Sequence, residues 1–510
     1  MASAKRPING EVEPSGGLDS DDRLRKVARS VSSPSGDHWT PDSWKAFPLK
    51  QDPFDGVPAS AMDPVLGRLR RLPPLVDPRE VDELRKQLAE VVEGRRFLLQ
   101  GGDCAERFAD CEPATISVKL KILLQMSLII CWGARKPLVR VARMAGQYPK
   151  PRSSKTEKVG DRVVTSFRGD CVNDFDPDKR EPDPNRLVDA YFHSAATLNY
   201  VRALLKGGFA DLHHSRHWQL DFVVKKELRQ QYEGLVSQLL DSLAFMNATG
   251  VEAPGARTVD LFSSHEGLVI PYESALVRDA EPGNGKGRYA LSSHFLWIGE
   301  RTRNLDHAHV EFFRGVENPV GVKVGPTADP AEIVEVCKKL DPSNRPGKVV
   351  LITRMGAAAV EEKLPPLIQA VRQADLKVVW QCDPMHGNSE TVSSCTNGED
   401  GNGGSEVRVK TRRFEKILQE LEASFCIHKE QGGHLGGVHF EMTGEDVTEC
   451  TGGPQELEDS QLMKRYTTYC DPRLNYAQSM EMAFKIAALL HGPSVGPSSS
   501  FDTAVDGQKL

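Results

Sequence analysis

Eight short apolar runs, separated by stretches with helical periodicity, are the feature that most constrains the fold of this chain. Each run is almost continuously apolar, which is typical of parallel strands buried on both faces. Consecutive parallel strands need a crossover connection, usually a helix, so eight such units predict an α/β fold of the (β/α)8 TIM-barrel type, with a doubly wound sheet as the alternative. The runs are Phe97–Gly101, Leu138–Arg143, Thr258–Phe262, Phe295–Glu300, Val320–Val324, Val349–Arg354, Val378–Cys382 and Val438–Glu441.

The remaining sequence divides into tails, an extension and an insert. Residues 1–38 are polar and lack periodicity, which predicts a disordered tail, and residues 39–95 form an N-terminal extension. In that extension, Asp77-Pro78-Arg79-Glu80 predicts the start of a helix that ends at Gly94. The barrel is expected over residues 96–491, followed by a flexible tail over 492–510.

One long insert, residues 155–250, interrupts the barrel pattern after the second run. It contains a charged loop rich in Gly, Asp and Pro and two helical patterns, near 186–203 and 224–247. A second, Gly-rich loop at 397–404 is expected to be a surface insertion that leaves the functional site unaltered.

Composition excludes several classes of function. The 65 Lys and Arg residues against 71 Asp and Glu give a net charge of −6, which is too mild for a protein that wraps nucleic acid or binds an anionic membrane. The longest apolar stretch, residues 122–134, is shorter than the roughly 18 residues of a membrane span. Ten Cys residues without a CxxC pair, and an acidic N-terminus unlike a signal or transit peptide, indicate a reducing, cytoplasmic location.

Potential metal ligands follow the predicted strands, at the barrel end where catalytic groups gather. Cys104 follows the first run, His386 follows the seventh, Glu441 ends the eighth and Asp471 lies shortly beyond it. A thiolate, an imidazole and two carboxylates can hold a divalent transition metal and leave a position open for substrate. The alternative for each is a packed thiol or a hydrogen-bonded polar group.

Basic side chains also lie in or directly after the runs. Cations are costly to bury unless they meet an anion, and neighbouring acids such as Asp103 and Glu300 are too few to neutralise them all. Because Arg forks match both phosphate and carboxylate, these residues predict a phosphorylated, carboxylated substrate. The residues are Arg143, Lys150, Arg152, Arg301, Lys323 and Arg354.

Six motifs give the chain a family resemblance. From about Trp39 to His491 the sequence resembles the class II (plant-type) 3-deoxy-D-arabino-heptulosonate 7-phosphate (DAHP) synthases. The resemblance implies an enzyme that condenses phosphoenolpyruvate with D-erythrose 4-phosphate and water to DAHP and phosphate, the first step of the shikimate pathway to chorismate and aromatic amino acids. The motifs occupy residues 100–106, 143–153, 299–303, 380–388, 439–444 and 470–473.

The resemblance also implies a cofactor and partners. It implies one divalent metal ion, Mn²⁺ in the first place, with Co²⁺, Zn²⁺ or Mg²⁺ as alternatives. It further implies a homo-oligomer, dimer or tetramer, and inhibition by an aromatic amino acid. No nucleic acid or membrane partner is expected.

Roles for individual residues follow from the same resemblance. The metal ligands would be Cys104, His386, Glu441 and Asp471. The phosphoenolpyruvate pocket would be formed by Arg143, Glu300, Arg301, Lys323 and Arg354. The erythrose 4-phosphate clamp would be formed by Lys150, Arg152 and Ser153.

Two of these residues are expected to take part in the chemistry itself. Glu300 and Lys323 would position water and move protons, and Lys323, lying among several cations, is expected to have a lowered pKa. The alternative for Lys323 is a simple anion anchor. Cys470, beside Asp471, is expected to be able to form a disulfide with Cys104 in the absence of metal, and the alternative there is an inert thiol.

Two other functions remain open at this point. The first is a different metal-dependent phosphosugar enzyme, either an aldolase or a synthase that uses another aldose phosphate. The second is a non-catalytic regulatory protein that retains the barrel. Loss of a metal ligand would favour the second function, and all four ligands are present in the sequence.

Overall fold

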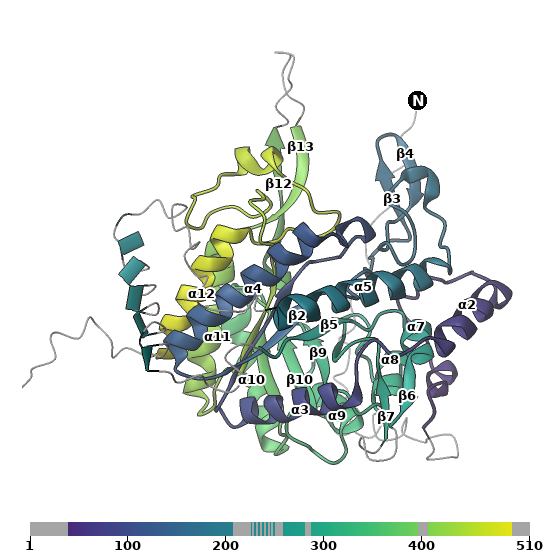
Figure 1. The fold of residues 1–510 in the computed structure, drawn as a ribbon, viewed down its shortest axis with the longest axis horizontal. Helices are drawn as coiled ribbons and strands as arrows, with labels where there is room; N and C mark the ends of the chain where they lie inside the picture. Colours follow the sequence, from purple (N-terminus) through teal and green to yellow (C-terminus); the bar gives the residue numbers. More distant parts are fainter. Residues whose placement is uncertain are drawn as a thin grey trace, which may run out of the picture. The chain divides into compact units, whose positions relative to one another are not determined.

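Eight parallel strands pair side by side into a closed barrel, which confirms the predicted (β/α)8 fold and excludes the doubly wound sheet (Figure 1). The order around the barrel is β1-β14-β11-β10-β9-β8-β5-β2, so each barrel strand pairs with the next one along the chain. The strands are β1 (Phe97–Gly102), β2 (Leu138–Arg143), β5 (Phe262–Glu266), β8 (Phe295–Ile298), β9 (Val320–Val324), β10 (Val349–Thr353), β11 (Val379–Cys382) and β14 (Gly437–Glu441).

A helix follows each of these strands, as the crossover argument requires. The predicted helix at 186–203 is confirmed as α5. The helices that follow the barrel strands are α4 (Pro113–Ala134), α5 (Arg186–Lys206), α7 (Ile270–Ala275), α8 (Ala308–Phe313), α9 (Pro330–Leu340), α10 (Val360–Gln373), α11 (Phe414–Glu430) and α12 (Tyr476–His491).

The computed structural model describes residues 39–207, 259–280, 287–395 and 406–491, with scattered residues between 226 and 249. The predicted tails, the Gly-rich loop and most of the predicted helix at 224–247 lie outside the described residues. Contacts divide the chain into Met1–Thr40 and Pro41–Leu510, and every element named here belongs to the second unit. The predicted domain boundaries stay predictions.

The third strand is the one strand that the sequence placed wrongly. It was expected at Thr258–Phe262, but β5 runs from Phe262 to Glu266 and is buried along its whole length. Several of its polar atoms have partners on neighbouring segments, since the Ser264 hydroxyl donates to the carbonyl of Ala142 at 2.9 Å and His265 Nε2 lies 2.8 Å from Glu273. Polar residues that resembled a loop therefore form a strand of the barrel core.

Helix α3 (Pro78–Val92) closes the amino-terminal end of the barrel. Asp77 and Glu80 form the predicted capping box at its start. Its buried Leu84, Leu88 and Val91 share one apolar cluster with barrel residues, among them Trp297 and Ile352. The N-terminal extension is therefore part of the barrel core, and α2 (Ala59–Arg71) of the same extension packs against α5 and α7.

Gly347 allows a loop at this end of the barrel to approach α3 closely. It has a φ of +80°, and a Cβ at this position would lie 2.4 Å from the carbonyl oxygen of Arg85 in α3. Because both the backbone conformation and the space exclude a side chain, only glycine fits here.

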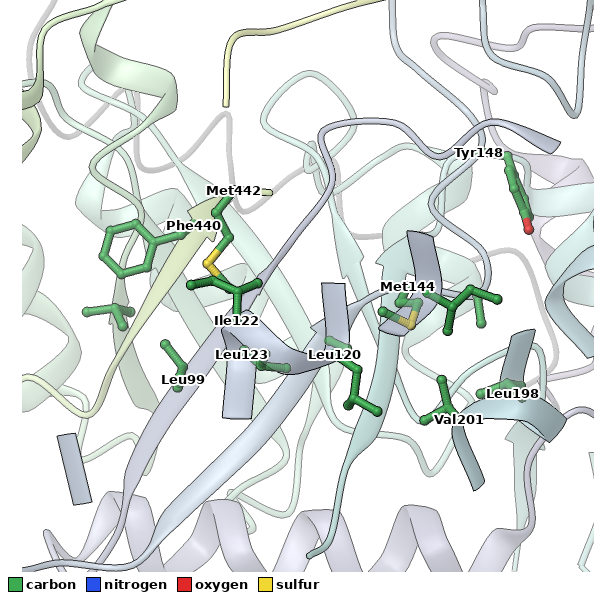
Figure 2. Close-up of a cluster of buried hydrophobic side chains, with 14 of the residues drawn as sticks. Leu99, Leu120, Ile122, Leu123, Met144, Tyr148, Leu198, Val201, Phe440 and Met442 are labelled. Atoms are coloured by element: carbon green, nitrogen blue, oxygen red, sulfur yellow. The ribbon is translucent and has the colours of Figure 1, made fainter. Parts of the chain in front are cut away.

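Helix α4 packs on the outside of the barrel strands, within a buried hydrophobic cluster. Figure 2 shows its Leu120, Ile122 and Leu123 within a cluster of buried hydrophobic side chains that also includes Leu99 and Phe440 of barrel strands. By length and composition α4 is apolar enough to cross a membrane, with a mean hydropathy of 1.7. The helix passes this test because it is longer than the apolar stretch seen in the sequence. It packs against α12, α5, β1 and β2, and this burial accounts for its apolar character.

Three antiparallel hairpins complete the described elements. The β12–β13 hairpin lies between β11 and α11, within the seventh barrel unit, and Figure 1 shows it at the end of the barrel opposite to α3. The hairpin strands are β3 (Thr156–Val159), β4 (Arg162–Thr165), β6 (Val277–Asp279), β7 (Arg288–Ala290), β12 (Ser389–Cys395) and β13 (Glu406–Arg412). Short 3-10 helices occupy Ser43–Ala46, Phe108–Asp110, Pro177–Lys179, His386–Asn388 and Asp459–Lys464.

Candidate active site

A cavity of about 400 Å³ opens at the carboxyl ends of the barrel strands. All the predicted site residues except Cys104 line it, and Cys104 is buried directly behind it. The predicted residues that line it are Arg143, Lys150, Arg152, Ser153, Glu300, Arg301, Lys323, Arg354, His386, Glu441 and Asp471.

The four predicted metal ligands lie together in one wall of the cavity. One donor atom each from Cys104, Glu441 and Asp471 lies within 4.8 Å of the others. His386 Nε2 lies 3.1 Å from Oε1 of Glu441, so the fourth side chain contacts one member of this group. Side chains from three strand ends and one loop therefore lie near one another, and their role as metal ligands stays a prediction.

The residues around this point fit a bound cation. The other carboxylate oxygen of Glu441, Oε2, is buried and makes no hydrogen bond, although the guanidinium of Arg412 lies 2.8 Å away. The mixture of sulfur, nitrogen and oxygen donors suits Mn²⁺, Co²⁺ or Zn²⁺. The Lys150 ammonium lies among the same donors, 2.8 Å from Cys104 Sγ and 2.7 Å from Asp471.

Surrounding cations control the charge of these donors. Burial alone would raise the pKa of both carboxyls, but His386 and Arg412 hold the pKa of Glu441 well below its usual range, and Lys150 lowers that of Asp471. Burial raises the pKa of the Cys104 thiol, and a hydrogen bond with Cys470 adds to this effect. Both cysteines are free thiols in this structure, and the predicted Cys104–Cys470 disulfide stays a prediction.

Arg143 forms more hydrogen bonds within the protein than its predicted role in substrate binding suggests. Its guanidinium donates to the carbonyls of Asp103 and Cys104, to Glu441 at 3.0 Å and to His439. Since a guanidinium has five N–H groups, these contacts leave little donor capacity for a substrate. His439 accepts from Arg143 through Nε2 and contacts Gln100 through Nδ1, as expected of a structural histidine.

The other predicted cations are placed nearer to the open cavity. Arg301 is exposed and donates to the Ser153 hydroxyl at 3.0 Å, which joins the two predicted substrate subsites. Arg354 is half-buried and donates to the carbonyl of His386 at 2.8 Å. Arg152 pairs with Glu157 of the β3–β4 hairpin. These side chains can therefore reach an anion in the cavity.

Lys323 and Glu300 differ in how they are held. Burial lowers the pKa of Lys323 to about 8 and the nearby Arg143 adds to the shift, although Asp383 opposes it, so the predicted direction is confirmed. Glu300 is fixed by Arg303, at 3.2 Å, and by the backbone N–H of Gly325, at 2.6 Å.

Four residues of this site were not singled out from the sequence. Glu266, at the end of β5, lines the cavity, and burial raises the pKa of its carboxyl. The correct position of the third strand would have revealed it. Asp383 contacts both Lys323 and His386, and its position after the seventh run was a usable signal.

The other two missed residues come from the hairpin that carries the Gly-rich loop. Lys410 of β13 contacts Asp471, and Arg412, two residues further along the same strand, pairs with Glu441. The expectation that the Gly-rich loop leaves the site unaltered stays a prediction, whereas the hairpin that carries this loop places Lys410 against Asp471 and Arg412 against Glu441. The loop itself, residues 397–404, lies outside the described residues.

Comparison with known proteins identifies the family of the chain. A family model described as the Class-II DAHP synthetase family matches residues 39–487. The chain belongs to the class-II DAHP synthetase family. This membership confirms the resemblance and the prediction that the chain is an enzyme.

Curated relatives in this family cover nearly the whole chain. The chain is 46% identical to the phospho-2-dehydro-3-deoxyheptonate aldolase of Neurospora crassa, over 89% of this chain and 95% of the relative. It is 45% identical to the AroG enzyme of that name from Mycolicibacterium smegmatis, over 88% and 94%. The Streptomyces coelicolor enzyme is 44% identical, over 88% and 96%.

A solved structure also matches the chain. It is a phospho-2-dehydro-3-deoxyheptonate aldolase from Francisella tularensis SCHU S4, with 15% identity and a TM-score of 0.41 over 84% of this chain and 96% of that one. This likeness is too weak to bear on the fold, which the strand pairings establish on their own.

Proposed function

We propose that this member of the class-II DAHP synthetase family condenses phosphoenolpyruvate with D-erythrose 4-phosphate and water to DAHP and phosphate. The observation that carries the proposal is the cavity itself, which combines a mixed metal donor set with Lys323, Arg301 and Arg354 at one barrel end. Relatives with 44–46% identity carry the name of this enzyme.

Cys104, His386, Glu441 and Asp471 would hold one divalent metal ion, with Mn²⁺ as the first candidate and Co²⁺, Zn²⁺ and Mg²⁺ as alternatives. When bound there, the ion supplies a Lewis acid for the aldehyde oxygen of erythrose 4-phosphate.

Phosphoenolpyruvate would bind through the cations that face the cavity. Arg301 and Arg354 have guanidinium groups that can form paired hydrogen bonds with phosphate or carboxylate, and Lys323 adds a point charge. Arg143, held between Glu441 and the backbone after β1, would contribute its charge more than its donors.

Erythrose 4-phosphate would bind beside this group through the 150–153 segment. Arg152 and Ser153 would meet its phosphate, and the hydrogen bond between Ser153 and Arg301 supports a position beside the phosphoenolpyruvate cations. Lys150 lies deeper, against the metal donors, so it would act at the aldehyde end of the substrate rather than at the phosphate end.

The chemical steps would need one carbon–carbon bond and one water. The methylene carbon of phosphoenolpyruvate adds to the aldehyde carbon, positive charge develops at the enol carbon, water adds there, and the phosphohemiketal loses phosphate. Lys323, with a pKa of about 8, is suited to transfer a proton near neutral pH. Glu300, fixed by Arg303 and Gly325, would position the water.

A phosphate-release assay with both substrates tests this proposal. Activity should disappear after chelation and return with a divalent metal, and no activity with any of the four metals would contradict the proposal. Comparing four- and five-carbon aldose phosphates separates DAHP synthesis from another phosphosugar condensation. Aromatic amino acids added to the assay, and light scattering of the purified chain, test the expected inhibition and homo-oligomer.

A further inference from the structure

Asp383 contacts a predicted metal ligand and the lysine proposed for proton transfer through a single oxygen atom. It follows β11 and is fully buried. Its Oδ2 contacts Nδ1 of His386 at 2.7 Å and also accepts a hydrogen bond from the Lys323 ammonium. One partner is a predicted metal ligand and the other is the lysine assigned to proton transfer.

The other oxygen of Asp383 has a purely local task. Oδ1 accepts the backbone N–H groups of Met385 and His386, at 3.0 and 3.2 Å, and so closes the turn after β11. The two oxygens therefore divide a structural role from a role at the site.

The contact with His386 decides which ring nitrogen can bind a metal. A carboxylate oxygen can only accept, so Nδ1 must carry a proton, and in the neutral imidazole, the form that binds a metal, Nε2 then keeps its lone pair. That Nε2 is the atom that lies 3.1 Å from Glu441, at the predicted ligand cluster. A carboxylate on the far nitrogen of a ligating histidine fixes both the tautomer and the ring orientation.

We propose that Asp383 is a positioning residue that prepares the metal-binding nitrogen of His386 and the ammonium of Lys323 at the same time. The inference rests on the proposed function, because it takes His386 as a ligand and Lys323 as a phosphoenolpyruvate contact. It assigns a task in the reaction to a residue that touches neither substrate nor metal.

Asp383→Asn separates the two oxygens of this residue. The amide oxygen can remain at Oδ1 and keep the turn, while an NH₂ group replaces Oδ2. This donor would favour the His386 tautomer with the proton on Nε2, which cannot bind a metal, and would face the Lys323 ammonium as a second donor.

Glu420→Gln is the matched control. Glu420 is buried, and its two oxygens accept from the backbone N–H of Met355 and the amide of Asn388, both at 2.7 Å, instead of facing His386 or Lys323. Burial raises the pKa of Glu420 to about 8, so Gln resembles its neutral form.

The experiment measures two affinities of the full chain, without erythrose 4-phosphate. Mn²⁺ affinity is determined by competition with a chromophoric chelator, and phosphoenolpyruvate affinity by calorimetry on metal-free protein. Asp383→Asn should weaken Mn²⁺ binding by about 10- to 100-fold, the range for partners of ligating residues. It should also weaken phosphoenolpyruvate binding, whereas Glu420→Gln should leave both affinities within about twofold, on the scale of a neutral amide exchange.

Unchanged Mn²⁺ affinity in folded Asp383→Asn would overturn the inference, and so would an equal loss in Glu420→Gln. If Asp383→Asn does not fold, Asp383→Ala decides the matter: recovery of Mn²⁺ affinity on addition of formate supports the inference, and no recovery overturns it. Neither measurement involves turnover, so the outcome is separate from the phosphate-release test of the proposed function.

Discussion

Two buried lysines near neighbouring barrel strands, one at each end of the barrel, show that the same residue type can have different roles. Lys323 lies in β9 near its carboxyl end, and Lys348 directly precedes β10 at the amino end. Both are buried, and burial lowers the pKa of Lys323 to about 8 and that of Lys348 to about 7.

Their partners and their access to solvent differ. Lys323 pairs with the Asp383 carboxylate and borders the cavity, beside His386 and Glu441. Lys348 donates to the backbone carbonyls of Val316 and Asn318, each at 2.5 Å, and is 0% exposed. A lowered pKa alone therefore does not identify a functional lysine, and a carboxylate partner at an open cavity is the feature that distinguishes Lys323.

Lys323→Met is expected to have the largest effect. Turnover should fall by about 10²- to 10⁴-fold, because a positioned proton-transfer group is lost, while phosphoenolpyruvate still binds weakly. Steady-state kinetics and calorimetry measure the two quantities. Retained turnover would sink the assignment of Lys323 as a proton-transfer group and would leave it as an anion anchor.

Lys348→Met should show the reverse pattern. Two buried carbonyls lose their donor, which costs about 1–3 kcal/mol of stability for each unsatisfied group, while kcat stays near the unaltered value. Denaturant unfolding and the phosphate-release assay measure these effects. A loss of kcat at unchanged stability would show that the two lysines are not separated in function.

The pH dependence of stability sharpens this comparison. Folding lowers the pKa of Lys348 to about 7, so the unfolded chain binds more protons than the folded chain between pH 7 and about 10, and the contribution of Lys348 to stability rises with pH by up to about 1.4 kcal/mol per unit. The stability deficit of Lys348→Met should therefore be larger at pH 9 than at pH 6.5. Thermal unfolding of both proteins at the two pH values measures it, and a constant deficit would contradict the lowered pKa.

Ser153→Ala is expected to have the smallest effect. Its hydroxyl is exposed and is proposed to meet the phosphate of erythrose 4-phosphate, so its loss should raise the KM for this substrate by about fivefold, the equivalent of 1 kcal/mol, and leave the KM for phosphoenolpyruvate nearly unchanged. Initial-rate kinetics with each substrate varied in turn test this. An equal change in both KM values would mean that the two subsites are not distinct.

Sequence reasoning predicted the barrel because its strands are apolar, and it failed where the strand is polar. Ser264 of β5 donates to Ala142 of β2, and Ser263 contacts Ser293 just before β8, and no periodicity in a single chain reveals such partners. Because of that error, Glu266 at the end of β5 was not identified as a candidate site residue.

The site was predictable as a set of residues, but not as a set of contacts. His386 was identified in its motif, whereas Asp383, three residues earlier, was not, because spacing does not show that one carboxylate reaches two side chains. Lys410 and Arg412 lie outside every motif and reach the site only through the pairing of β12 with β13. Lys323 lies within an apolar run and Lys348 directly precedes one, but only the fold shows that Lys323 meets a carboxylate at the cavity and Lys348 meets backbone carbonyls.

The position of α3, which closes the amino-terminal end of the barrel, has a consequence for how the chain folds. Its apolar residues Leu84, Leu88 and Val91 are synthesised before any barrel strand, yet they pack on residues as late in the sequence as Val379 of β11. During synthesis this surface must wait for almost the entire barrel, and contacts between such distant segments form slowly. Packing of α3 onto the amino-terminal end of the barrel is therefore a late folding step, and until then apolar surface of the nascent chain is exposed to aggregation. Deletion of α3 would leave the apolar residues at this end of the barrel exposed permanently.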